Sequence, residues 1–310
     1  MIQVHRYVGA GSRFAAACLR ASNLAARRGN ELQILARGAE HVVSTAWTID
    51  AHELSPDGAY VLARGDQGRR FGVWDTATGA LLFEGHDDSR RESIRASLAA
   101  VGDNTRAFVA TRSRPSALVV RMVPGGLEEC WLSTIGMIAF EVQQVQSLGG
   151  TWVGVLGHSD GDQFDTVVAV DLRARDTELL QTALREPPSI KDWGYRVAIG
   201  PGTDSQAVIF RDAEWDHDDV PDDEADAFVG IAVWDLATAK VIQRIPYRGP
   251  VAVGAEIGGD ASRVAVQLPD HVVWISRVDG VEHRIDALAL DPYHLAVAHV
   301  DGADIVISSL

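Results

Sequence analysis

Two segments of the chain carry the same short pattern. Residues 71–79 read FGVWDTATG and residues 231–239 read IAVWDLATA. A third segment, 168–174, reads VAVDLRA and places Val170 and Asp171 at the positions of Trp74 and Asp75. Each copy begins as an apolar strand, passes through a polar turn and resumes as a second apolar strand. This self-similarity predicts a repeat architecture in which each copy belongs to one small antiparallel sheet.

The stretch before the first copy, residues 52–65, reads as two short strands around the turn Ser55-Pro56-Asp57-Gly58. Pro presets the first φ angle of such a turn, and Gly tolerates a positive one. Two strands, a loop, a strand ending in Trp-Asp, a turn and a fourth strand together resemble the WD-repeat β-propeller family, in a degenerate form. The dipeptide Gly85-His86 resembles the Gly-His of that family and is expected after the fourth strand. The resemblance then implies a structural role for His86.

Counting strands in fours divides the whole chain into the seven blades of a single all-β propeller domain. The expected blades span residues 12–46, 50–90, 94–134, 139–184, 192–248, 250–286 and 287–310. The last range supplies only three strands, whereas residues 1–8 form a strand without a blade. We therefore expect the N-terminal strand to complete the seventh blade and to close the ring, which removes exposed sheet edges. Residues 173–185 have helical spacing, but their position predicts a turn and a fourth strand.

Third strands are expected to place aromatic side chains between blades, so we predict core positions for Trp74, Trp234 and Trp274. Asp75 and Asp235 are expected to bind the amides of the turns that follow them. The two cysteines, Cys18 and Cys130, have no C-x-x-C spacing and are interpreted as buried thiols of a cytoplasmic protein.

Composition excludes several classes of protein. No apolar run approaches the roughly 20 residues that span a bilayer, and the N-terminal stretch, interrupted by Arg13, is not expected to act as a secretory signal. The net charge of −15 argues against a general nucleic-acid binder. Nearly all cationic residues are arginines, and with the high alanine content this resembles a bacterial protein.

Much of the negative charge lies in one segment, residues 212–226, which holds nine acidic residues and neither Lys nor Arg. It is an insertion between the second and third strands of the fifth blade, longer than a connection requires. The corresponding loop of the fourth blade contains further carboxylates, so both are expected on one face. A docking surface for a basic protein or peptide is one interpretation. Its expected residues are Trp215 as the anchor, with Asp216, Asp218, Asp219, Asp222, Asp223 and Glu224.

Two alternatives stay open for these loops. One is a divalent-cation site, because carboxylates and imidazoles occur at loop spacing; its candidates are Asp160, Asp162, Asp165, His158 and His217. The other is a solvated loop without a specific partner. Arginines are expected over the second and third blades of the same face, which would make this face positive there and negative over the fourth and fifth blades. Alternatively, the arginines pair locally with Asp87 and Asp88. The arginines predicted to contact a partner are Arg69, Arg70, Arg90 and Arg91.

No nucleophile elbow, P-loop, dinucleotide-binding glycine motif or HExxH motif is present. We therefore expect a non-catalytic interaction scaffold without a cofactor, since the family resemblance implies a rigid ring that displays variable loops. The alternatives are a propeller hydrolase or lyase with a cation at the acidic loops, and a structural subunit of a larger bacterial assembly.

Overall fold

The computed structural model describes most of the chain and consists there of strands and turns. It describes residues 2–8, 18–36, 38–86, 94–101, 104–111, 116–123, 126–134, 140–149, 152–159, 165–171, 180–184, 195–203, 205–213, 230–247, 249 and 255–310. In these ranges the strands form seven four-stranded antiparallel sheets, which confirms the predicted all-β class. None of the described ranges contains a helix long and apolar enough to cross a membrane.

Six sheets each consist of four consecutive strands, and they are numbered here in chain order. The first contains β2 (Cys18–Arg20), β3 (Asn23–Arg28), β4 (Glu31–Ala36) and β5 (Ala39–Ser44). The second contains β6 (Ile49–Leu54), β7 (Tyr60–Gly65), β8 (Arg70–Asp75) and β9 (Leu81–His86). The third contains β10 (Ile94–Val101), β11 (Asn104–Thr111), β12 (Ser116–Val123) and β13 (Gly126–Thr134).

The fourth sheet contains β14 (Phe140–Gly149), β15 (Trp152–Ser159), β16 (Asp165–Asp171) and β17 (Leu180–Leu184). The fifth contains β18 (Tyr195–Pro201), β19 (Gln206–Ala213), β20 (Gly230–Asp235) and β21 (Lys240–Pro246). The sixth contains β22 (Ile257–Gly259), β23 (Arg263–Gln267), β24 (His271–Ser276) and β25 (Glu282–Asp286). The seventh joins β26 (Ala289–Asp291), β27 (Ala296–Asp301) and β28 (Asp304–Ser309) to β1 (Ile2–Tyr7).

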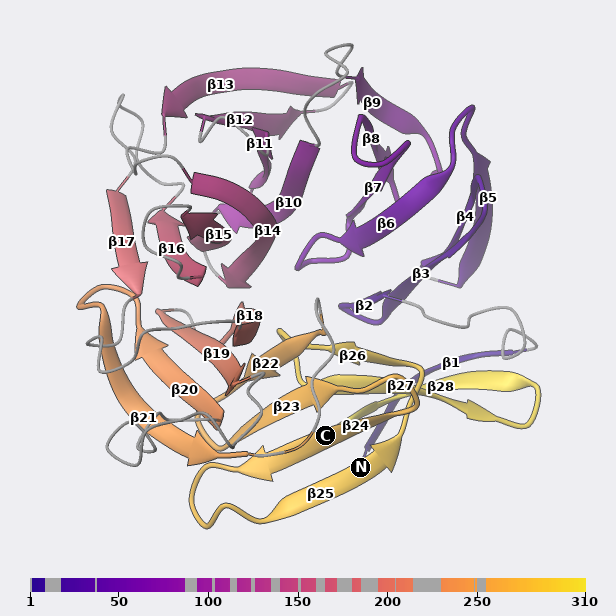
Figure 1. Cartoon of the computed structure of the whole chain (residues 1–310). Coiled ribbons are helices and arrows are strands. Elements are labelled where there is room, and N and C mark those ends of the chain that lie inside the picture. Colours follow the sequence, from indigo (N-terminus) through magenta and orange to yellow (C-terminus); the bar gives the residue numbers. More distant parts are fainter. Residues whose placement is uncertain are drawn as a thin grey trace.

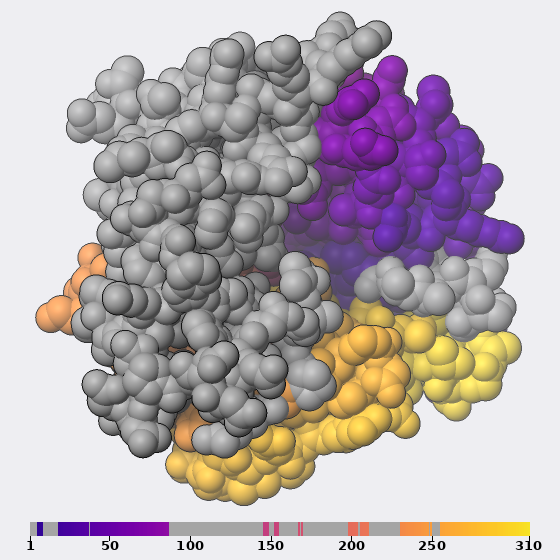
Figure 2. Space-filling view, in the orientation of Figure 1, coloured from indigo at the N-terminus to yellow at the C-terminus, as the bar shows by residue number. Residues whose placement is uncertain are grey.

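The sheets surround a common centre, and the strands nearest to it are β2, β6, β10, β14, β18, β22 and β26 (Figure 1). Neighbouring sheets touch through these inner strands: β2 contacts β6, β6 contacts β10, and the series continues through β14 and β18 to β22. The seventh sheet contacts the sixth through β23 and β26, and the first through β26 and β2. Figure 2 shows the N-terminal sheets in indigo beside the C-terminal sheets in orange and yellow on one face.

The seventh sheet contains both ends of the described chain. Strand β1 pairs antiparallel with β28 from Ile2↔Ser309 to Tyr7↔Ile305, as the strand count predicted. Arg6 forms ion pairs with Asp301 at 2.7 Å and with Asp304 at 2.8 Å. The Tyr7 side chain is buried, and its hydroxyl donates to the Ser22 carbonyl of the first sheet at 2.9 Å. The N-terminal strand therefore connects the last sheet to the first.

The apolar core lies between neighbouring sheets rather than in one central mass. Leu19 and Leu24 of the first sheet pack with Ile305 and Ile307 of the seventh. Other clusters join the first sheet to the second, the fourth to the fifth, the fifth to the sixth and the sixth to the seventh. Since both faces of these sheets are covered, the strands are apolar on both sides over much of their length.

The predicted turn at Ser55-Pro56-Asp57-Gly58 is confirmed. The Gly58 amide donates to the Ser55 carbonyl at 2.7 Å, and Gly58 has a φ of +69°. A Cβ atom at Gly58 would lie 2.8 Å from the Arg20 carbonyl oxygen, so a side chain there would disturb the contact between the first and second sheets. The turn thus packs directly against the backbone of Arg20.

Deletion of residues 1–8 should cause aggregation or severe destabilisation. The truncation exposes the edge of β28 and removes the buried Tyr7. The matched control is Arg6→Gln, which removes only exposed ion pairs and should leave the melting temperature nearly unchanged. Thermal unfolding and size-exclusion chromatography measure both effects. An unchanged melting temperature after truncation would contradict a structural role for β1.

Candidate functional site

Most residues predicted to bind a partner or a cation lie outside the described ranges. These residues are Asp160, Asp162, Trp215, Asp216, His217, Asp218, Asp219, Asp222, Asp223, Glu224, Arg90 and Arg91. Among the described residues, no group of three or more His, Cys, Asp or Glu side chains is arranged to hold a metal ion. The docking surface and the cation site therefore stay predictions.

Four predicted site residues are described. His158 lies directly opposite Asp165 in the register of β15 and β16, at the end of the hairpin whose connection carries Asp160 and Asp162. Arg70 forms ion pairs with Asp66 at 3.2 Å and with Glu84 at 3.7 Å. Arg69 is exposed in the turn before β8. Local pairing therefore accounts for Arg70, whereas Arg69 remains accessible on the loop face.

The two Trp-Asp repeats adopt the same local structure. The Asp75 carboxylate accepts hydrogen bonds from the Thr78 amide at 2.8 Å and the Thr78 hydroxyl at 2.9 Å. Asp235 accepts from the same two groups of Thr238 at 2.8 and 2.7 Å, and these bonds lower the pKa of Asp235. Trp74 and Trp234 are both buried against the preceding sheet. The Trp-Asp pattern thus combines one core side chain with one turn-capping carboxylate.

Two positions differ from the sequence expectation. His86 is the last residue of β9 rather than a residue beyond it, and its side chain is exposed. Trp274 is half-buried and only packs against the edge of a core cluster. The reason is register: Ser276 begins its turn as Asp75 does, so Ile275 occupies the core position of Trp74. Trp274 consequently faces the other side of the sheet.

A cluster of polar side chains that the sequence did not reveal lies at the centre of the ring. Arg20, at the end of β2, is only 3% exposed, and its Nη2 donates to both carboxylate oxygens of Glu256 at 2.9 Å. Its Nη1 donates to the carbonyls of Leu19 and Leu290 at 2.7 and 3.4 Å, and its guanidinium lies 5.1 Å from the centre of the Tyr293 ring. One side chain therefore connects the first, sixth and seventh sheets.

Further bonds extend this central cluster. Gln146 of the fourth sheet donates to Glu256 at 3.3 Å, and the Tyr293 hydroxyl donates to the Ser147 carbonyl at 3.1 Å. Burial raises the pKa of Tyr293, so its hydroxyl stays protonated and remains a donor. Groups from four sheets thus compensate the Arg20 charge at the ring centre, where an unpaired charge would be costly. The Arg20 Nε is buried there without a hydrogen-bond partner among the described residues.

Asp291 is fully buried and fixes the adjoining turn. Its carboxylate accepts from the Ala21 amide at 2.7 Å, the Tyr293 amide at 3.0 Å and the His294 amide at 3.2 Å. Ala21 and Ser22 both have positive φ angles, which residues with a Cβ adopt at a cost in conformational energy. The bond to Asp291 offsets part of that cost and holds Arg20 in place. The His294 imidazole also contacts Asp291, at 2.9 Å, and this raises the pKa of His294.

Two titratable side chains near this cluster, the half-buried His52 and the buried Cys18, have shifted pKa values. Burial lowers the pKa of His52 on β6 to about 4, and the His52 Nε2 lies 2.9 Å from the Ala25 carbonyl. Burial raises the pKa of Cys18 on β2 to about 12. Cys18 is therefore a thiol at neutral pH and a poor nucleophile, as expected for a core position.

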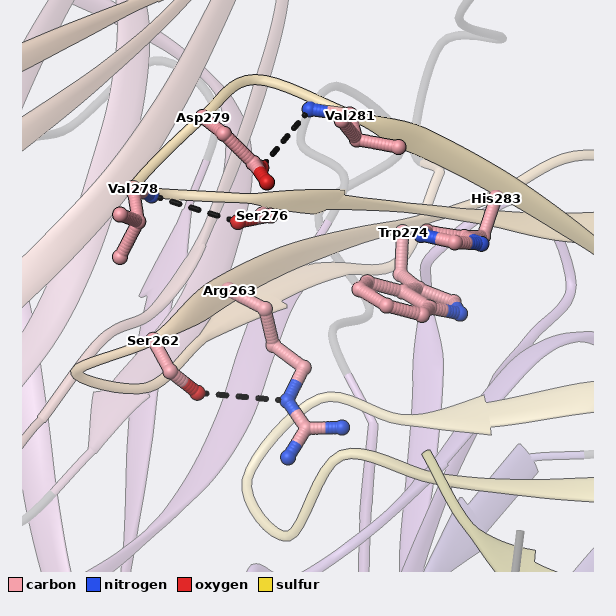
Figure 3. A pocket seen from close by; sticks show the side chains of 8 residues that line it. All are labelled: Ser262, Arg263, Trp274, Ser276, Val278, Asp279, Val281 and His283. Carbon is pink, nitrogen blue, oxygen red and sulfur yellow. Dashed lines mark hydrogen bonds between the residues drawn. The ribbon is translucent and has the colours of Figure 1, made fainter.

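A surface pocket of about 430 Å³ lies at one end of the sixth sheet (Figure 3). Trp274, which the register of β24 places on the opposite side of the strand from Ile275, forms part of the pocket wall beside Arg263 and His283. The turn between β24 and β25 forms the opposite wall. No sequence pattern indicated this pocket, because it depends on a one-residue difference between otherwise similar third strands.

Comparison with known proteins identifies the fold. No family model matches the chain, and no curated protein matches it by sequence. The chain is similar in structure to hydrazine synthase from Kuenenia stuttgartiensis, with 12% identity over 97% of each chain and a TM-score of 0.62.

Two other solved structures are similar. One is KlAtg21 in its complex with the coiled coil of AgAtg16, with 11% identity over 86% of this chain and 81% of that one and a TM-score of 0.57. The other is the WD40 domain of SCAP from fission yeast, with 11% identity over 92% of this chain and 62% of that one and a TM-score of 0.52. These similarities show a fold of the β-propeller type.

Replacing Glu256 by Gln should lower the free energy of unfolding by about 3 kcal/mol, because the buried Arg20 then loses the carboxylate that is hydrogen-bonded to it. The double variant Arg20→Met/Glu256→Leu should be more stable than Glu256→Leu alone, because it leaves no uncompensated charge. Urea unfolding of the variants measures both effects. Equal stability of Glu256→Gln and the wild type would show that this ion pair does not hold the ring.

His52 should make the protein less stable in mild acid. Its folded pKa of about 4 lies below the unfolded value, so the unfolded chain takes up the proton first as the pH falls below about 6.5. Between pH 7.5 and pH 5.0 this lowers the free energy of unfolding by about 2 kcal/mol. The variant His52→Gln should lose less stability over the same interval by about that amount. His294 affects the free energy of unfolding in the opposite direction, because its raised pKa adds stability that is lost as the pH rises. Both the wild type and His52→Gln contain His294, so its contribution cancels when the two are compared.

Proposed function

We propose that the seven sheets are the blades of one closed propeller domain, and that this domain is a non-catalytic, cytoplasmic interaction scaffold of the WD-repeat type. Its partner is a protein or peptide with a basic patch, which docks on the loop face that carries the acidic segment. The similarity to the SCAP WD40 domain and to KlAtg21, which was solved with a coiled coil bound, supports the fold on which this proposal depends.

The single observation that carries the proposal is the hairpin of β19 and β20. These strands pair in unbroken register from Gln206↔Asp235 to Arg211↔Gly230, and their side chains Phe210 and Ile231 are fully buried. Sixteen residues, 214–229, connect them, whereas four residues, 66–69, connect the corresponding strands β7 and β8. The hairpin is complete without the longer connection. A loop of this length that the framework does not need is commonly a functional one.

The composition of this connection indicates its partner. Residues 212–226 hold nine acidic residues and no basic one, so their field attracts a basic surface and accelerates its association. Trp215 lies within the segment, and tryptophan is enriched among the residues that dominate binding energy at interfaces. We propose Trp215 as the anchor, with the surrounding carboxylates setting the association rate.

A cation-dependent enzyme is the second candidate, and one observation favours it. His158 and Asp165 lie opposite each other in register, beside the connection that carries Asp160 and Asp162. Metal analysis distinguishes the two candidates. One tightly held divalent cation per chain, lost in Asp160→Ala or Asp162→Ala, would support the enzyme and count against a metal-free scaffold.

Replacement of residues 214–229 by the four-residue turn of residues 66–69 should abolish co-purification of the native partner. The melting temperature should stay nearly unchanged, because the β19–β20 pairing is retained.

Trp215→Ala should weaken partner binding by about 2 kcal/mol or more, again with little effect on folding. Changing Asp218, Asp219, Asp222 and Asp223 to Asn should instead slow association and flatten its salt dependence. Native complexes that survive the loop replacement would exclude this face as the docking site.

A further inference from the structure

The pocket beside Trp274, called the Trp274 pocket below, arises because this tryptophan does not fill the core position that Trp74 and Trp234 fill in the second and fifth sheets. The fully buried Ile275 takes the position that Trp74 and Trp234 fill in their sheets. The turn that follows begins at Ser276 with the same two backbone hydrogen bonds as the turn that begins at Asp75. A large aromatic side chain is therefore left on the pocket side of β24.

The aromatic side chain is held in a three-layer stack. The His283 ring lies parallel to Trp274, with ring centres 3.9 Å apart and an angle of 13° between the planes. The Arg263 guanidinium carbon lies 5.8 Å from the centre of the Trp274 ring, as expected for a cation–π contact. Figure 3 shows His283 and Arg263 on opposite sides of Trp274. The stack comes from three adjacent strands, β23, β24 and β25, so these side chains are positioned before any ligand arrives.

The charge on Arg263 is only partly neutralised by its neighbours. Its Nε lies 3.4 Å from the Ser262 hydroxyl and 3.5 Å from the Asp260 carboxylate. Asp260 is mainly engaged in its own turn, where it accepts from the Ser262 amide at 2.7 Å and the Arg263 amide at 2.8 Å. Within the described ranges, the recorded hydrogen bonds of the Arg263 side chain involve Nε alone. The two terminal nitrogens remain available to an anionic oxygen.

The opposite wall adds apolar surface. Val278 is 89% exposed and Val281 is 47% exposed in the turn between β24 and β25. The Asp279 carboxylate in the same turn accepts from the Val281 amide at 3.2 Å and so shapes this wall. A volume of about 430 Å³ accommodates a few side chains of an extended segment.

We propose that this pocket binds an extended peptide segment in which an Asp or Glu side chain is next to an apolar one. The carboxylate pairs with the terminal nitrogens of Arg263, and the apolar side chain covers Val278, Val281 and the edge of Trp274. This site is independent of the acidic segment, because the turns around the pocket lie at the opposite end of the strands from the second-to-third-strand connections. The scaffold then carries two sites of opposite charge preference, one on each face.

Panning a random ten-residue peptide library against the wild type and against Arg263→Gln tests the proposal. The matched control is Arg284→Gln, which removes the same charge from a 60% exposed arginine on β25 that does not line the pocket. The wild type and the control should enrich peptides with an acidic residue beside an apolar one, whereas Arg263→Gln should not. Equal enrichment by all three proteins, or none by the wild type, would overturn the site.

A double-mutant cycle with one enriched peptide separates recognition from structural support of Trp274. Changing the peptide carboxylate to its amide, or Arg263 to Gln, should each weaken binding at least about tenfold, and the two changes together should cost little more than one. Additive losses would show that Arg263 does not contact the carboxylate. A protein with residues 214–229 replaced should bind the peptide as the wild type does, so failure of the acidic loop proposal and failure of this one are distinguishable.

Discussion

A guanidinium buried at the centre of the ring is the constraint on which much of this structure depends. Arg20 is almost fully shielded from water, so its charge must be compensated locally. Glu256 supplies the counter-charge from the sixth sheet, and backbone carbonyls of the first and seventh sheets accept hydrogen bonds from Nη1. Both partners reach their positions only when the sheets between them are in place. The interaction therefore links the first sheet to the sixth and the seventh.

The surrounding structure serves the same arrangement. Asp291 accepts a hydrogen bond from the Ala21 amide, next to Arg20. Gly58, which has no side chain, lets the neighbouring turn approach the Arg20 carbonyl. The hydroxyl of Tyr7 on the N-terminal strand donates to the Ser22 carbonyl. Apolar clusters between neighbouring sheets then supply most of the burial. The Arg20–Glu256 pair and the pairing of β1 with β28 hold the sheets together, so the connections and outer faces are not needed for this purpose. Both proposed binding sites lie on such connections and outer faces, where function commonly resides in folds of this kind.

Much of the fold could be predicted from the residues because the strands are local units. Alternation and turn chemistry identified the hairpins, and the lone N-terminal strand predicted the pairing of β1 with β28. Residues 180–184 have helical spacing but pair with β16 as a strand, since the sheet offers partners that an isolated helix lacks. The capping roles of Asp75 and Asp235 were also evident, because an Asp at a turn bonds amides only two or three residues away.

The sites depended on relationships that are not local. The sequence shows Trp274 as another third-strand tryptophan, and only the register of its turn reveals that Ile275 has taken the core position. Likewise, Arg20 and Glu256 are 236 positions apart, and neither has a neighbour in the sequence that marks it as buried. By itself, then, the sequence determined the all-β class, the four-strand units, the joining of the chain ends and the acidic connection, because each follows from short-range periodicity or composition. Only the tertiary structure decided the central ion pair and the Trp274 pocket, because both arise where side chains from separate strands or sheets meet.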